Sequence, residues 1–161
     1  MSTPTERLAE LGLTLPPVAA PLAAYVPAVR TGDLVFTSGQ LPLVDGRLTT
    51  TGKVGAEVSP ETAAECARLA ALNGLAAVAA EVGGLDAVAR VVKVVVFVAS
   101  APDFTGQAQV ANGASELIGA VLGPSGQHAR SAVGMAVLPL DSPVEVELVV
   151  EVRATPTIRM L

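Results

Sequence analysis

The stretch that decides the fold is HARSAVGMAVLPLDSPVEVELVVEV, residues 128–152, near the end of a chain of 161 residues. It contains two apolar runs, 132–138 and 144–152, which are separated by Pro139-Leu140-Asp141-Ser142-Pro143. Two prolines and an aspartate prevent a helix from continuing and are typical of a turn. The stretch therefore predicts a hairpin of two strands.

The second run alternates between acidic and apolar side chains, with Glu145, Glu147 and Glu151 on one side of the predicted strand. Arg130 stands at the beginning of the first strand, so a hairpin would place an arginine and several carboxylates on neighbouring strands. Spacing alone favours an edge hairpin with a solvated acidic face and an ordinary arginine. The alternative is a ligand site that uses both charges.

The rest of the chain predicts alternating strands and helices in a single domain. Ser59-Pro60-Glu61 is a helix start, and the β-branched run 88–99 is typical of a central strand covered on both faces. Two helices are expected on one face of a mixed sheet, which is the α+β class. The expected helices are 3–12, 59–83 and 105–123, and the expected strands are 26–29, 34–38 and 88–99, with a loop and a short strand at 43–58. All of them belong to one domain, 1–161. Its core is expected at about 21–152, with an N-terminal helical segment at 1–14 and a tail at 154–161.

The composition predicts an oligomer. Hydrophobic residues make up 51% of the chain but aromatic residues only 2%, so the apolar mass is Ala, Val and Leu. A chain of this size cannot bury that much apolar surface alone, and we expect part of it to lie between subunits.

Charge and patterning argue against several partners. The net charge is −5 and lysines and arginines are not clustered, which argues against a nucleic-acid partner. No uninterrupted apolar run is long enough for a membrane span, and the first residues lack a signal pattern, so we expect no membrane partner and a cytoplasmic location.

The single cysteine and the single histidine restrict the chemistry further. Cys66 is the single cysteine, so it cannot form an internal disulfide or belong to a cysteine-based metal cluster. His128 is the single histidine, so no pair of histidines is available for a zinc site, and we expect no metal. For Cys66 a small buried hydrophobic role is favoured over a reactive thiol. For His128 a loop role is favoured over that of a titrating partner.

Three segments together resemble one known family, the small reactive-intermediate deaminases called the RidA or YjgF/YER057c/UK114 family, and among them a longer-looped branch. The resemblance covers roughly residues 21–152. The segments are Tyr25 followed by VFTSGQLP at 35–42, the strand and Asp-Phe ending at 91–104, and ARSAV at 129–133 followed by Leu138-Pro139 and VEVE at 144–147.

The resemblance implies a chorismate-mutase-like fold, a homotrimer, and ligand pockets at the subunit interfaces. Members hydrolyse enamines or imines to a 2-oxo acid and ammonia without a cofactor. By position, Arg130 matches the arginine that holds the substrate carboxylate, and Glu145 matches the glutamate that positions or activates water. Ser38 and Tyr25 match the family's pocket serine and tyrosine, and Gly39 is expected to bring backbone close to the ligand.

These residue types suit the implied chemistry. A guanidinium meets a planar carboxylate with two parallel hydrogen bonds and stays charged when water is excluded. Hydrolysis also needs a group that accepts a proton from water, and a carboxylate can do this.

The chain departs from the family pattern at Ala23-Ala24, at His128 and at Ala132, which changes the expected pocket wall. The segments 123–127 and 43–58 are expected to reshape the entrance. The ligand expected is a small metabolite that bears a carboxylate. A non-catalytic trimer that senses such a metabolite is the alternative function, and RNA cleavage, suggested for relatives, is disfavoured by the acidic balance.

Overall fold

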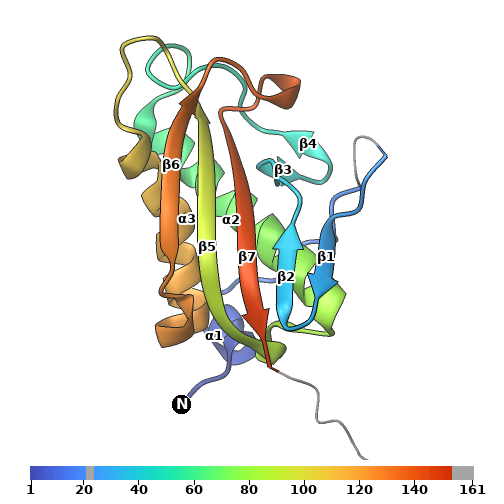
Figure 1. Cartoon of the computed structure of the whole chain (residues 1–161). Helices are drawn as coiled ribbons and strands as arrows, with labels where there is room; N and C mark the ends of the chain where they lie inside the picture. The colour runs from blue at the N-terminus through green and yellow to red at the C-terminus, as the bar shows by residue number, and fades with distance from the viewer. Residues whose placement is uncertain (21–23, 154–161) are drawn as a thin grey trace, which may run out of the picture.

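A five-stranded mixed sheet with two long helices on one face organises the chain (Figure 1). The computed structural model describes residues 1–20 and 24–153. The predicted α+β class is confirmed. The helices are α1 (Pro4–Glu10), α2 (Pro60–Val82) and α3 (Gln107–Leu122), with short 3-10 turns at Leu85–Ala87, Gly123–Gly126 and Pro139–Asp141, and the strands are β1 (Ala28–Thr31), β2 (Leu34–Thr37), β3 (Leu43–Val44), β4 (Arg47–Leu48), β5 (Val88–Ala99), β6 (Ala129–Met135) and β7 (Val144–Val152).

The predicted hairpin between the last two strands is wrong. The order in the sheet is β1-β2-β7-β5-β6, so β5 lies between β6 and β7. Helix α3 returns the chain to the beginning of β5, so β6 pairs with β5 in parallel, while β7 runs antiparallel to both β5 and β2. No side chain of β6 is fully buried, whereas every second residue of β7 is. The more exposed strand, β6, therefore lies at the edge of the sheet, and β7, with its alternation of buried and half-buried residues, lies in the middle.

Strand β5 also differs from its prediction. It lies one place from the edge, and its side chains alternate between buried and partly exposed positions instead of being covered on both faces. Its apolar open face is therefore only partly covered by the residues that the structure describes.

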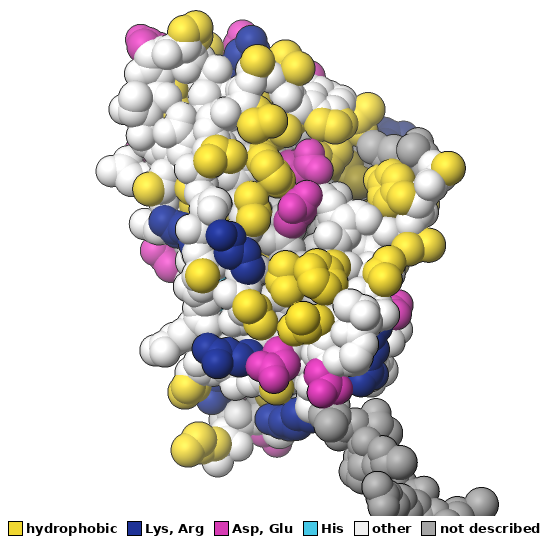
Figure 2. All heavy atoms as spheres, in the orientation of Figure 1, with side chains coloured by type: hydrophobic (Ala, Val, Ile, Leu, Met, Phe, Trp, Pro, Cys, Tyr) yellow, Lys and Arg dark blue, Asp and Glu magenta, His cyan; other side chains and the backbone are white. Residues whose placement is uncertain are grey.

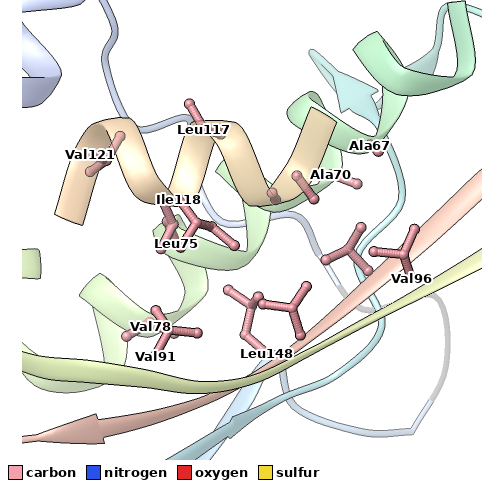
Figure 3. Close-up of a cluster of buried hydrophobic side chains, with 14 of the residues drawn as sticks. Ala67, Ala70, Leu75, Val78, Val91, Val96, Leu117, Ile118, Val121 and Leu148 are labelled. Carbon is pink, nitrogen blue, oxygen red and sulfur yellow. The ribbon is translucent and has the colours of Figure 1, made fainter. Parts of the chain in front are cut away.

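The core lies between the sheet and the two long helices (Figure 3). Ser59 caps α2 by accepting a hydrogen bond from the Thr62 backbone amide, as the sequence predicted. The helices approach closely because Gly113 faces the Ala64 carbonyl, where any added methyl group would overlap it. The side chains that fill this layer are small aliphatics, including Leu75 and Val78 of α2, Leu117, Ile118 and Val121 of α3, and Val91, Val96 and Leu148 of the sheet.

The remaining predicted elements form with small shifts. Helix α1 lies within the predicted range 3–12 and begins with a capping box between Thr3 and Glu6. Strands β1 and β2 pair antiparallel across their turn, and the loop that follows contains the short β3–β4 hairpin. Asp45 and Gly46 both have positive φ there, as a tight hairpin turn requires. The predicted tail at 154–161 and Ala23 lie outside the described residues.

Within the described ranges, α2 is the one helix long and apolar enough to cross a membrane. About 67% of its most apolar window is buried inside the structure, which is typical of the core helix of a folded domain.

In the part of the chain that the structure describes, the opposite face of the sheet carries no helix and exposes apolar side chains. Figure 2 shows hydrophobic groups gathered over the middle of this face, with acidic groups between them. Val29, Phe36, Val92 and Val133 are all exposed by more than a third. Monomeric proteins seldom leave a contiguous apolar surface of this kind uncovered.

Candidate ligand site

The carboxylate of Glu145 lies directly against the backbone of Gly39. Glu145 is the second residue of β7, and Gly39 follows the end of β2, next to the bridge between Gln40 and Val146. A methyl group at Gly39 would overlap the Glu145 carboxylate. Only glycine therefore leaves room for the acid in this place, and two residues predicted for the site are brought together.

Ser38 and Tyr25 lie beside this pair. The Ser38 hydroxyl donates a hydrogen bond of 2.6 Å to the Val26 carbonyl, which ties the end of β2 to the segment that contains Tyr25. Tyr25 and Gly39 line a small hollow of about 30 Å³, enough for about one water molecule. Tyr25 itself is 45% exposed.

The local environment raises the pKa of Glu145. The main cause is partial burial, and the charge of Glu147, two residues along the same face of β7, adds to it. Burial also raises the pKa of Glu147. A carboxyl group whose pKa is shifted toward neutrality is better suited to exchange protons with a substrate or water.

Arg130 lies at a different place, where the edge strand β6 meets α3. Its Nη1 donates to Asn112 Oδ1 at 2.8 Å and to Ser115 Oγ at 3.1 Å, and its Nη2 donates to the Ala108 carbonyl at 3.2 Å. The side chain does not extend into solvent but bends over the helix.

One chain does not bring Arg130 and Glu145 together. Arg130 pairs in register with Val94 of β5, and Val94 pairs with Leu148 of β7. Both of these residues are in the helix-covered core, so Arg130 belongs to that face. Glu145 pairs with Phe97 and belongs to the open face. The expectation that the arginine and the carboxylates share neighbouring strands is therefore wrong.

The structure adds residues that the sequence did not single out. Asn112 and Ser115 hold Arg130, and Ser115 Oγ also lies 2.9 Å from Nε2 of His128. Ala108, Asn112 and Ser115 are spaced by four and three residues, which puts them on one face of a helix. The placement of Asn112 and Ser115 on one face of the predicted helix was the available signal.

Cys66 is buried in the core, and burial raises the pKa of its thiol, against a smaller opposing effect of a hydrogen bond with Thr50. This agrees with a small hydrophobic role. Among the described residues, no group of three or more His, Cys, Asp or Glu side chains converges on a point that could hold a metal ion.

Comparison with known proteins identifies the class to which this fold and these residues belong. Residues 5–152 match the family described as "YjgF/chorismate_mutase-like, putative endoribonuclease". The chain belongs to this family, which confirms the resemblance to the YjgF/UK114 proteins.

Individual relatives agree with this assignment. Protein TCP17 of Trypanosoma cruzi is 47% identical over 145 residues, which cover 89% of this chain and 91% of TCP17. A crystal structure from Shewanella oneidensis MR-1, described as a putative endoribonuclease, is 32% identical with a TM-score of 0.91, covering 94% of this chain and all of that one. Escherichia coli TdcF, solved with bound serine, is 25% identical with a TM-score of 0.61, covering 88% of this chain and 96% of TdcF.

Proposed function

We propose that the chain assembles as a homotrimer and hydrolyses small enamines or imines that carry a carboxylate, at pockets formed between subunits. The products are a 2-oxo acid and ammonia. The observation that carries this proposal is the Glu145 carboxylate, which is partly buried with a raised pKa against Gly39, a residue that also lines a small hollow.

The division of the site supports pockets between copies. Glu145, Gly39, Ser38 and Tyr25 form one half on the central strands, and Arg130 forms the other half at the edge strand and on the opposite face. An edge arginine can complete a site only where the neighbouring half belongs to another copy. The exposed apolar face of the sheet supplies a surface on which copies can pack.

The chemistry assigns a role to each half. Arg130 binds the substrate carboxylate, because a guanidinium matches its two oxygens. A water molecule then attacks the imine carbon, and Glu145 accepts a proton from that water as the new carbon–oxygen bond forms. The electron pair of the carbon–nitrogen double bond moves to nitrogen, which takes up a proton, and a second proton, returned by Glu145, makes the nitrogen a leaving group. The new hydroxyl group then loses its proton as the carbon–oxygen double bond forms, and the carbon–nitrogen bond breaks to release ammonia. An enamine enters the same sequence after a proton moves from its nitrogen to its carbon, which gives the imine. TdcF, a relative that binds serine, agrees with a ligand that carries a carboxylate.

The family description favours a second candidate, cleavage of RNA. The net charge of −5 and the acidic groups on the open face do not favour a polyanionic substrate. A trimer that binds a metabolite without turnover is the third candidate. It differs from the first candidate only in that the bound ligand is not hydrolysed.

The test uses 2-aminoacrylate, generated from serine by a dehydratase, with pyruvate followed as the product. Wild-type protein is expected to accelerate pyruvate release, and Arg130→Ala to lower kcat/KM by about 10- to 100-fold, the effect of losing hydrogen bonds to a charged group. Glu145→Gln is expected to lower kcat with less effect on KM. Arg30→Ala, in the edge strand β1, is the matched control and should behave as wild type.

No acceleration by the wild type, or equal acceleration by Arg130→Ala, rejects the deaminase. Binding of 2-oxobutanoate without any turnover supports the sensor instead. Cleavage of a mixed-sequence RNA that Glu145→Gln abolishes supports the nuclease.

A further inference from the structure

Three groups on one face of α3 hold the Arg130 guanidinium. The Ala108 carbonyl, the Asn112 amide oxygen and the Ser115 hydroxyl each accept one hydrogen bond from it, at distances between 2.8 and 3.2 Å. The side chain of an exposed arginine is usually mobile, and each contact of this kind costs rotamer entropy. Three acceptors within two turns of one helix therefore fix the direction of the guanidinium.

His128 adds one more hydrogen bond to this network, through Ser115. Its Nδ1 lies 2.6 Å from the Gly126 carbonyl, which can only accept, so Nδ1 carries the proton. In the neutral ring Nε2 is then an acceptor, and the Ser115 hydroxyl at 2.9 Å donates to it. This orientation directs the lone pairs of Ser115 toward Arg130. The hydrogen bonds run in series from Arg130 through Ser115 and His128 to the backbone at Gly126.

The donors that remain on Arg130 define what it can bind. A guanidinium has five N–H donors. Within the described part of the chain both donors of Nη1 and one donor of Nη2 are engaged. The Nε–H and one Nη2–H are left, on nitrogens attached to the same carbon. Two donors so placed match the two oxygens of one carboxylate.

We propose that Asn112, Ser115 and His128 are positioning residues, which aim the two remaining donors of Arg130 at the carboxylate of a small ligand. The identity of the ligand rests on the proposed function; the positioning of Arg130 does not. Asn112 and Ser115 act on Arg130 directly, and His128 acts through Ser115.

A purely structural link between β6 and α3 is the competing explanation for these hydrogen bonds. It predicts that their loss lowers stability without changing ligand affinity. The positioning role predicts a weaker Kd for a carboxylate in a protein that remains folded. Thermal unfolding of each variant separates these two outcomes.

The experiment measures binding of 2-oxobutanoate by calorimetry and turnover of 2-aminoacrylate in the full chain. Ser115→Ala and Asn112→Ala are each expected to raise Kd and KM about tenfold, the effect of one hydrogen bond to a charged group, with kcat changed by less than about twofold. Ser115→Thr keeps the hydroxyl and should restore Kd to within about threefold. Ser125→Ala, on the nearby 3-10 turn, is the matched control and should leave Kd unchanged.

A double-mutant cycle tests the series arrangement. His128→Leu alone should weaken binding, and His128→Gln, which keeps an acceptor for Ser115, should weaken it less. Added to Ser115→Ala, His128→Leu should have no further effect, because its influence passes through the missing hydroxyl. Fully additive losses overturn the proposed path from His128.

The ¹⁵N signals of the guanidinium provide a readout that does not depend on activity. In wild type the Arg130 Nη groups, assigned with Arg130→Lys, should show hindered rotation, and Ser115→Ala should release it. Freely rotating Nη groups beside normal binding overturn the positioning role and leave the deaminase intact. Hindered rotation in a protein that binds no 2-oxobutanoate overturns the proposed function and the ligand assigned here, while the positioning of Arg130 stands.

Discussion

The two faces of the sheet both carry aliphatic side chains but differ in how far these side chains are buried. The face under α2 and α3 is filled by Val, Leu and Ile side chains with almost no exposure. The open face carries Val, Phe and Glu side chains that are covered only in part. Strand β7 contributes to both faces through its alternation. Within the described residues, the chain therefore fills the layer under α2 and α3 and leaves the open face only partly covered.

The largest expected effect is on the covered face. Leu148→Ala removes a side chain in contact with Gly74 of α2 and should lower the free energy of unfolding by about 3 kcal/mol, because the cavity cannot fully close. Val149→Ala, the next residue on the other face, should cost about 1 kcal/mol. Urea unfolding measures both. Equal losses would show that the two faces are packed alike.

An intermediate effect is expected for the open face. Phe36→Glu places a charge on the apolar open face and should weaken assembly by about 2 kcal/mol per subunit, because the carboxylate loses its water when copies pack. Sedimentation should show three copies for wild type and one for the variant. Leu11→Glu, at the end of α1 with the same 44% exposure as Phe36, is the control. Dissociation by Leu11→Glu but not by Phe36→Glu would place the interface elsewhere.

The smallest expected effect concerns the acids on the open face. The pKa values of Glu145 and Glu147 are raised in the folded chain, chiefly by burial, so the folded state keeps protons that the unfolded state has lost. Their contribution to stability is fully present below the ordinary value of 4.5 and disappears as the pH rises through the folded pKa values.

Replacement of both acids by glutamine should therefore stabilise the protein at neutral pH relative to wild type and make little difference in acid. The gain should stay below about 1 kcal/mol, because both groups are partly solvated and water screens their charges. Unfolding midpoints measured between about pH 4 and pH 8 give the slope that tests this. A wild type that becomes more stable as the pH rises over this range, relative to the variant, contradicts the assignment.

The helices and strands of the fold were readable from local patterns. Ser59-Pro60-Glu61 marked the start of α2, because a helix cap depends on neighbouring residues. The pairing of β6 with β7 was predicted wrongly. Adjacency in the sequence favoured a hairpin, but the exposed β6 suits an edge and the alternating β7 suits the centre.

The residues of the candidate site could be predicted from the sequence, but their positions relative to one another could not. The contact between Gly39 and Glu145 joins residues more than a hundred positions apart, so no local pattern could show it. The hydrogen bonds from Arg130 to Asn112 and Ser115 form because the chain connection after α3 places β6 next to that helix.

By itself the sequence determined the α+β class, the positions of the long helices and the alternating character of β7, because these follow from caps, turns and side-chain periodicity. Only the tertiary structure decided that β5 separates Arg130 from the carboxylates, and that the two halves of the site lie on opposite faces of the sheet. The physical reason is that strand order depends on which strand can pair along both edges while it buries every second side chain under the helices. All the strands compete for that place, and no single segment of sequence records the outcome.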